Sequence, residues 1–144
     1  MSWTDEMKAV VELVKTEAPD RLNYIMQPEF VSANEETLEY TVAFPIEEWQ
    51  LNPAGTLHGG ACATAFDIAI GMGCVPHSKG RRFVTVDTFI SYIGRMSDKD
   101  KFVVTVKPVK IGATFMRFQA EGYSKKTGKL IATSAMSYFV LGDR

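Results

Sequence analysis

A Gly-rich turn that leads into an Ala-rich helix is the stretch of this 144-residue chain that most restricts its possible folds. Residues 52–75 read N-P-A-G-T-L-H-G-G-A-C-A-T-A-F-D-I-A-I-G-M-G-C-V. The first four are turn signals, and no Gly or Pro follows Gly60 until Gly71, which predicts a helix of several turns. Gly59 and Gly60 stand where the unpaired N–H groups of a starting helix point outward. These donors suit a carbonyl oxygen that is becoming an oxyanion, although the two glycines could also simply permit tight packing of the helix on a sheet.

Asp67 carries the single charge between Ala61 and Val75, in a segment too apolar for a solvated surface helix. A buried carboxylate is costly unless it is paired or used in chemistry. Gly60 and Asp67 are seven residues apart, roughly 10 Å along a helix, so one substrate atom cannot easily touch both within a single chain. Either Asp67 serves a separate purpose, or a second copy of the helix brings its own Asp67 to this glycine turn.

The motif N-P-A-G-T-L-H-G-G, with an acidic residue seven positions after its second glycine, resembles the hotdog-fold acyl-CoA thioesterases. The phenylacetate-type (PaaI-like) branch and its small eukaryotic relatives are the most similar, and the resemblance extends from about Glu36 to Leu141. It implies an α+β hotdog fold, in which a curled antiparallel sheet wraps a long central helix. It also implies dimers joined through sheet edges, often paired again into tetramers, with active sites across the dimer interface.

The composition, with 46% hydrophobic and 23% charged residues, is that of one soluble globular domain over residues 1–144. A net charge of −1 provides no electrostatic footprint for nucleic acid, and no apolar run approaches the ~20 residues that cross a bilayer. The N-terminus lacks a signal-peptide pattern, so we expect a cytoplasmic protein, with residence inside an organelle left open. Cys62 and Cys74, ~18 Å apart on one predicted helix, cannot form a disulfide and are expected to be small buried thiols.

Local patterns predict the remaining elements. Residues 2–17 predict a helix that ends before Pro19 and either packs on the core or covers a substrate tunnel as a lid. Residues 22–31 predict an irregular strand broken by Pro28. The core begins at about residue 36, where alternation over 36–44 predicts a half-buried strand closed by Pro45.

Four further strands are predicted after the central helix, over residues 83–93, 101–109, 114–123 and 130–141. Turn residues at 97–100 and 125–128 predict hairpins between the first two strands and between the last two. One long helix followed by consecutive hairpins is an α+β pattern. Both faces of the strands are apolar and one helix covers only one face, which predicts a homo-oligomer. The residues that need a further partner surface are Phe89, Phe115, Phe139 and Leu141.

Hydrolysis of a thioester needs an oxyanion pocket and an activated water or a nucleophile. We assign the pocket to the backbone N–H of Gly59 or Gly60. Asp67 from the other subunit is expected to be the general base or the nucleophile; the alternative is that it belongs to a buried polar network.

The resemblance implies three more site residues. It places Asn52 beside the thioester or the attacking water, His58 as a supporting hydrogen-bond donor, and a strand hydroxyl, here Thr85, opposite Asp67. Relatives often carry Ser at that position, and Thr keeps the hydroxyl but adds a methyl that stiffens χ1. Asn52 could instead be a turn residue that bonds its own backbone, and His58 could instead position the turn. Asp87 shares the face of Thr85 if the strand alternates regularly, and is then a second polar group in the site or a structural residue.

CoA carries phosphates, which require a basic surface. The candidates are Arg95, Lys107, Lys110 and Arg117, with Lys79, Arg81 and Arg82 in the loop after the helix, although each could be ordinary solvated charge. The resemblance suggests that Gly112 allows close approach beside the pantetheine arm. No cofactor and no metal are expected, because two histidines without paired ligand spacing do not resemble a zinc site. No G-x-S-x-G elbow supports a serine hydrolase.

We therefore predict hydrolysis of acyl-CoA thioesters by a homodimer or homotetramer that binds neither nucleic acid nor membranes. Two alternatives stay open. Hotdog hydratases and dehydratases also place a carboxylate and a histidine near a helix start, and a non-catalytic acyl-CoA-binding module would use the fold only to bind. The acyl group is left open, because aromatic and medium- or long-chain groups all suit a tunnel lined by Phe, Met and Tyr.

Overall fold

The computed structural model describes residues 1–142, which form an N-terminal helix, a long central helix and one sheet. The elements before the centre are α1 (Trp3–Thr16), α2 (Leu22–Ile25), β1 (Glu29–Ala33), β2 (Tyr40–Ile46) and the 3₁₀ turn η1 (Glu48–Gln50). The central helix, α3, spans Gly59–Met72. The strands that follow are β3 (Phe83–Tyr92), β4 (Asp100–Ile111), β5 (Phe115–Ser124) and β6 (Leu130–Val140).

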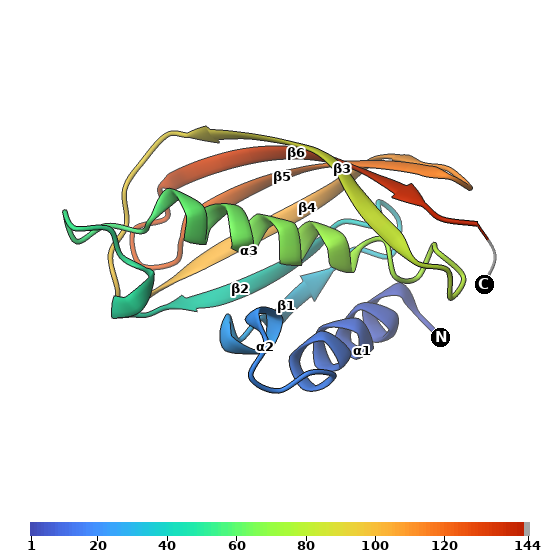
Figure 1. Cartoon of the computed structure of the whole chain (residues 1–144), viewed down its shortest axis with the longest axis horizontal. Coiled ribbons are helices and arrows are strands. Elements are labelled where there is room, and N and C mark those ends of the chain that lie inside the picture. Colours follow the sequence, from blue (N-terminus) through green and yellow to red (C-terminus); the bar gives the residue numbers. More distant parts are fainter. Residues whose placement is uncertain (143–144) are drawn as a thin grey trace.

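The sheet has the strand order β1-β2-β4-β5-β6-β3, and every neighbouring pair is antiparallel. It curls around α3, with α1 and α2 on the side of β1 and β2 (Figure 1). Strands β1 and β3 are therefore the two edges of the sheet. This is the predicted arrangement of one long helix wrapped by a curled antiparallel sheet.

Helix α3 is the centre of the hydrophobic core. Phe66 is fully buried and packs edge-on against Phe102 of β4, with ring centroids 5.4 Å apart. The sheet also bonds to the helix backbone, because the buried hydroxyl of Tyr40 on β2 donates to the carbonyl oxygens of Ala69 (2.6 Å) and Ile70 (3.2 Å). Such buried hydroxyls need a partner, and carbonyls near a helix C-terminus are available acceptors.

Helix α1 packs on the core through its first turns. Ser2 caps the helix, since its side chain accepts a hydrogen bond from the backbone N–H of Asp5 (3.1 Å). The buried residues of α1 are Trp3, Met7, Val10 and Val11, and they face β1 and α3. The packing role predicted for this helix is confirmed.

Three sequence-based predictions about the fold were wrong. Residues 22–31 do not form one irregular strand, because the first four coil into α2 and β1 starts only at Glu29. Pro45 does not close β2 and instead pairs with Lys101 of β4. A proline is tolerated there because β1 pairs with β2 only up to Ala43, which leaves that side of Pro45 at an edge.

The third wrong prediction is the hairpin at residues 97–100. Strand β3 pairs only with β6, so the segment after β3 crosses the end of the sheet to reach β4. Turn-forming residues predict that the chain changes direction, but they do not predict which strand the next strand pairs with. The hairpin at 125–128 is confirmed between β5 and β6, with Gly128 in the left-handed region (φ 73°).

Both cysteines are free and buried, as expected, although Cys74 lies just beyond the end of α3 and not on it. Burial raises the pKa of each thiol to about 12, and the charge of Asp67 adds to this effect at Cys74. Neither thiol is therefore an effective nucleophile at neutral pH. In the part of the chain described here, no helix is both long and apolar enough to cross a membrane.

Gly122 of β5 lies against the fully buried ring of Phe102, and a methyl group at residue 122 would overlap that ring. Gly122→Ala must displace a core aromatic, so it should lower the free energy of unfolding by about 1–3 kcal/mol. Urea denaturation followed by circular dichroism measures the change. Gly142→Ala is the control, because a methyl there meets nothing within 4 Å. An unchanged midpoint in Gly122→Ala would contradict this packing.

Candidate functional site

The turn before α3 is built around the side chain of Asn52. Its Oδ1 accepts hydrogen bonds from the backbone N–H groups of Ala54 (3.0 Å) and Thr56 (3.1 Å), and its Nδ2 donates to Thr56 Oγ1 (2.9 Å). The interpretation of Asn52 as a turn residue is thus confirmed. Its proposed contact with a substrate or water remains a prediction. Such a contact would have to use the second N–H of the Asn52 amide, which these three hydrogen bonds leave free.

His58 is the N-cap of α3, and its side chain already accepts a hydrogen bond from the backbone of Gly60, one of the two N–H groups expected to form the oxyanion pocket. The backbone N–H of Gly60 donates to His58 Nδ1 at 2.8 Å. A neutral imidazole that accepts at Nδ1 carries its proton on Nε2, which remains available as a donor. The N–H groups of Gly59 and Ala61 have no acceptor within residues 1–142, so the free donors at this helix start are those of Gly59 and Ala61.

Asp67 is exposed in the single chain, so the prediction of a buried carboxylate was wrong. The residues on either side of it, Phe66 and Ile68, are buried. The sequence around Asp67 is apolar because α3 is enclosed on most sides. The exposed stripe of the helix that carries Asp67 is narrow. The carboxylate oxygen Oδ1 accepts a hydrogen bond from Thr85 Oγ1 at 3.1 Å, as the resemblance implied for a hydroxyl opposite Asp67.

Strand β3 runs back along α3 and is bonded to it at both ends. Near its start Thr85 bonds Asp67, and at its end the hydroxyl of Tyr92 donates to the carbonyl oxygen of Gly59 (2.9 Å). The two chemically distinct parts of α3, its N-terminal turn and its carboxylate, therefore lie under opposite ends of the same edge strand (Figure 1).

Asp87 does not share a face with Thr85, contrary to the expectation from regular alternation. A β-bulge at Val86 leaves that residue unpaired, so that Thr85 pairs with Tyr138 and Asp87 with the next residue on β6, Ser137. Successive residues of β6 point to opposite faces, which places Asp87 on the face of the sheet away from α3. There it lies 3.8 Å from the guanidinium of Arg117, which donates to Ser137 Oγ at 2.7 Å.

A groove of about 650 Å³ extends from Asp67 and Thr85 along the outside of α3. Its volume is within the range of small-molecule sites. Its apolar walls include Leu13 and Val14 of α1, Ile68 and Met72 of α3, Phe83 of β3, and Leu141, which follows β6. Polar residues also line it: Glu17, Asn23, Arg81, Arg82 and the buried Ser78. The second half of α1 thus forms a wall of the groove while its first half packs on the core.

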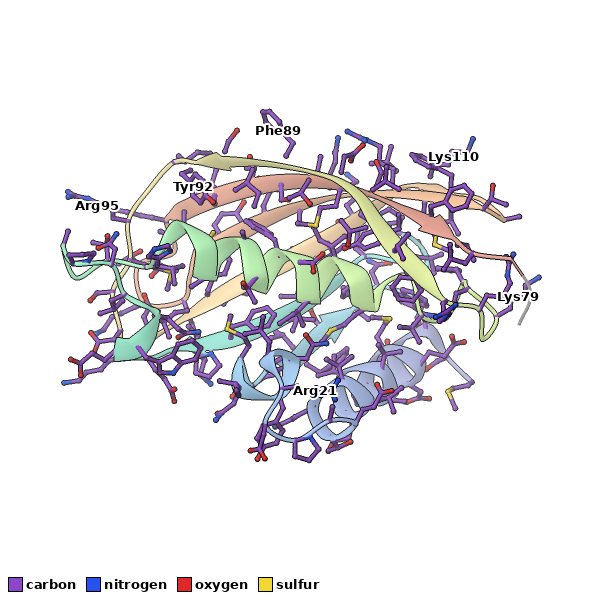
Figure 2. The ribbon with its side chains drawn as sticks, in the orientation of Figure 1. Arg21, Lys79, Phe89, Tyr92, Arg95 and Lys110 are labelled. Atoms are coloured by element: carbon purple, nitrogen blue, oxygen red, sulfur yellow. The ribbon has the colours of Figure 1, made fainter. Side chains whose placement is uncertain are left out.

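The basic residues predicted to bind CoA do not form one cluster. Arg95 lies at the end of the molecule that carries the glycine turn, whereas Lys110 and Lys79 lie toward the other end (Figure 2). Lys107 is exposed on the outer face of the sheet, beside a hollow that Phe89 also lines. Arg81 holds its loop in place through Nη2, which donates to the carbonyl oxygen of Ala113 (2.6 Å).

Gly112 lies in the β4–β5 hairpin, where its backbone N–H donates to the carbonyl oxygen of Phe115 at 2.9 Å. Its local role is therefore to close this turn. Among the described residues, no group of three His, Cys, Asp or Glu side chains is arranged to hold a metal ion.

Sequence reasoning missed Tyr138, whose hydroxyl lies 3.4 Å from both Asp67 Oδ1 and the Asp67 carbonyl oxygen. Its position on β6 is opposite Thr85, so the two hydroxyls reach the same carboxylate. The sequence predicted a strand over residues 130–141, but which helix residue Tyr138 contacts depends on the pairing of β3 with β6 and on the bulge.

Comparison with known proteins agrees with this fold. A sequence profile described as the thioesterase superfamily matches residues 54–131. Acyl-coenzyme A thioesterase 13 of Mus musculus is 32% identical over 132 residues, covering 91% of each chain. The chain therefore belongs to the thioesterase superfamily.

Solved structures show that its architecture is the hotdog fold. The crystal structure of zebrafish thioesterase superfamily member 2 superposes with a TM-score of 0.80 over 99% of both chains, at 25% identity. The PaaI protein of Escherichia coli, from the phenylacetic acid degradation operon, superposes with a TM-score of 0.76 at 17% identity, covering 94% of this chain and 96% of its own. The latter likeness bears on the fold alone.

If His58 serves as the N-cap of α3, its acceptor should matter for stability. His58→Ala removes the acceptor of the Gly60 N–H and should lower the free energy of unfolding by about 1 kcal/mol, whereas His58→Asn supplies another capping oxygen and should retain most of it. Urea denaturation of the two variants beside wild type measures the difference. Equal losses in the two variants would show that the cap is not what His58 contributes.

Proposed function

We propose that this protein hydrolyses acyl-CoA thioesters to the free acid and CoA. The observation that carries the proposal is the exposed carboxylate of Asp67, which Thr85 bonds through Oδ1 and which lines a groove with apolar walls. Membership of the thioesterase superfamily supports hydrolysis over hydration of the thioester or binding without catalysis. The 32% identity to a mouse protein named acyl-coenzyme A thioesterase 13 supports the same reaction.

The active site is proposed to form between two subunits. Gly59 and Asp67 lie about 12 Å apart along α3, too far for one thioester carbon to contact both directly. Strand β3 offers the route to a second chain: no strand of the described residues pairs with its outer edge, and Val84, Val86, Phe89 and Tyr92 on it are exposed. An unpaired, apolar edge strand is a ready site for pairing with another copy.

A two-fold axis at this edge would bring the two half-sites together. Antiparallel pairing of β3 with its copy places the Thr85 end of one strand beside the Tyr92 end of the other. Because Thr85 bonds Asp67 and Tyr92 bonds Gly59, the carboxylate of one subunit would approach the glycine turn of its partner. A homodimer built this way has two equivalent sites.

Further pairing into a homotetramer would use the outer face of the sheet. Val84, Phe139 and Phe115 are direct neighbours across three strands there, and all three are exposed. Phe89 also points away from the sheet on the side opposite α3 (Figure 2). Burial of these rings against a second dimer would remove apolar surface from water.

In the proposed reaction, the thioester carbonyl oxygen accepts a hydrogen bond from the Gly59 N–H, and Asp67 Oδ2 accepts a proton from water as that water attacks the carbonyl carbon. The oxyanion then collapses, the C–S bond breaks, and the departing CoA thiolate takes the proton back from Asp67. Alternatively, Oδ2 itself attacks, the thiolate leaves, and water hydrolyses the resulting anhydride. Both routes use the carboxylate oxygen that Thr85 leaves free.

The remaining site residues have supporting roles in this proposal. His58 would donate through Nε2, and Asn52 would hold the turn beside the thioester or the water. In the two-fold dimer, Arg95 just after β3 of one subunit would approach Arg82 just before β3 of the other, and these two cations are the ones we propose first for the CoA phosphates. Lys107, Lys110 and Gly112 remain weaker candidates for the CoA moiety, since both lysines lie on the outer face of the sheet and Gly112 closes a turn.

Replacing Asp67 by Asn preserves the shape of the side chain but removes the base or nucleophile, and should lower kcat about 10²-fold or more. Release of CoA thiol should be measured with acyl-CoAs from acetyl to palmitoyl, and with phenylacetyl-CoA and a hydroxylated aromatic thioester. Asp87→Asn is the matched control, because Asp87 lies on the opposite face of the sheet, and it should stay within about twofold of wild type.

Three outcomes of this panel would contradict the proposal in different ways. Full activity in Asp67→Asn would remove the carboxylate from the mechanism. Hydration of an enoyl-CoA without thiol release would favour a hydratase of the same fold. Binding of acyl-CoAs without any turnover would favour a non-catalytic binding module.

A further inference from the structure

Tyr138 places a buried hydroxyl beside the proposed catalytic carboxylate. The residue is 2% exposed on β6, and its hydroxyl lies 3.4 Å from Asp67 Oδ1, 3.4 Å from the Asp67 carbonyl oxygen and 3.5 Å from the sulfur of Met136. Each contact is long because a single hydroxyl proton faces several acceptors. The carboxylate is the strongest acceptor of the three, since hydrogen bonds to an ionised group are stronger than neutral ones.

The Tyr138 hydroxyl keeps its proton over the whole physiological pH range. Burial, and after it the negative charge of Asp67, raise the pKa of Tyr138 well above its ordinary value. The group is therefore a permanent donor, and it cannot compete with Asp67 as a base.

Two donors approach the same oxygen of Asp67. Thr85 Oγ1 lies 3.1 Å from Oδ1 and Tyr138 OH lies 3.4 Å from it, while no donor among residues 1–142 bonds Oδ2. The donors come from adjacent strands, because Thr85 and Tyr138 are a direct pair of the β3–β6 ladder. The side chain is thus held from one side by a rigid pair, and its second oxygen is left for other contacts.

We infer that Tyr138 is a positioning residue, which together with Thr85 fixes the Asp67 carboxylate so that Oδ2 is the atom that acts on water or on the thioester. This inference rests on the proposed function. It assigns Tyr138 no direct contact with the substrate. Its contribution is the orientation of a carboxylate that would otherwise rotate freely in an exposed position.

The alternative is that Tyr138 only ties β6 to the helix, and the chain contains a matched example of that role. Tyr40 is equally buried, on β2, and its hydroxyl donates to the carbonyl oxygens of Ala69 and Ile70 on the same helix. It has no contact with a carboxylate. Tyr40→Phe therefore removes a helix contact alone, whereas Tyr138→Phe removes a helix contact together with the contact to Oδ1.

Both variants should be compared with wild type for kcat, KM and urea unfolding on the best substrate of the acyl-CoA panel. Tyr138→Phe should lower kcat about tenfold with KM unchanged, as expected when a single hydrogen bond that orders the reactive group is lost. Tyr40→Phe should lose stability, because it removes the buried hydrogen bond to the Ala69 carbonyl oxygen, and should keep kcat within about twofold. Equal effects of the two variants on kcat would overturn the inference.

A double-mutant cycle with Asp67→Asn tests whether Tyr138 acts through the carboxylate. Tyr138→Phe should cause no further loss of the residual rate in the Asp67→Asn background, because the group that it positions is already gone. An undiminished loss in that background would overturn the inference and leave the proposed hydrolysis intact. If wild type cleaves no thioester while still folding, the proposed function fails first, and the inference about Tyr138 fails with it.

Discussion

The fixed rise of an α-helix is the constraint on which the proposed site depends. Gly59, which has a free N–H, precedes Asp67 by eight residues, so about 12 Å of rigid backbone lies between this donor and the carboxylate. Neither part can move toward the other, because α3 is packed on nearly all sides and its fully buried residues include Phe66 and Ile70. The proposed donor and the proposed carboxylate are thus two half-sites of this chain, and under the proposal a second copy of the chain completes each site.

Edge strand β3 links the chemistry to assembly. One of its edges pairs with β6, its ends bond α3 at Asp67 and Gly59, and its outer edge has no partner within residues 1–142. The bulge at Val86 changes which side chains reach the helix: Thr85 faces the carboxylate, and Asp87 turns to the opposite face. A single strand thus bonds the carboxylate that we propose as the catalytic group, determines which polar groups surround it and presents the edge where a second subunit would pair.

The features that depend on local signals could be predicted from the sequence. Turn residues, capping and apolar spacing are short-range effects, and they located α3, its N-terminal turn and most strands to within a few residues. Features that depend on pairing between distant strands could not be predicted. The turn residues at 97–100 predicted a hairpin where the chain crosses the end of the sheet. The face of Asp87 depends on the bulge at Val86, which no residue type in that strand predicts. Tyr138 became a neighbour of Asp67 only through the β3–β6 register, and the exposure of Asp67 itself followed from the edge position of β3.

The most direct test of a site shared between subunits is complementation between two defective chains. Gly59→Pro removes the Gly59 N–H, and it suits the backbone because Pro is favoured at the first position of a helix and His58 already has extended angles (φ −63°, ψ 136°). Gly59→Ala keeps the N–H and controls for contact of the new side chain with the ring of Tyr92. Chains carrying Gly59→Pro or Asp67→Asn should each be inactive, and dimers with one of each, isolated through two different tags, should recover about half of the wild-type kcat, because one of their two sites is intact. Mixed dimers as inactive as either parent would show that the donor and the carboxylate of a site come from the same chain.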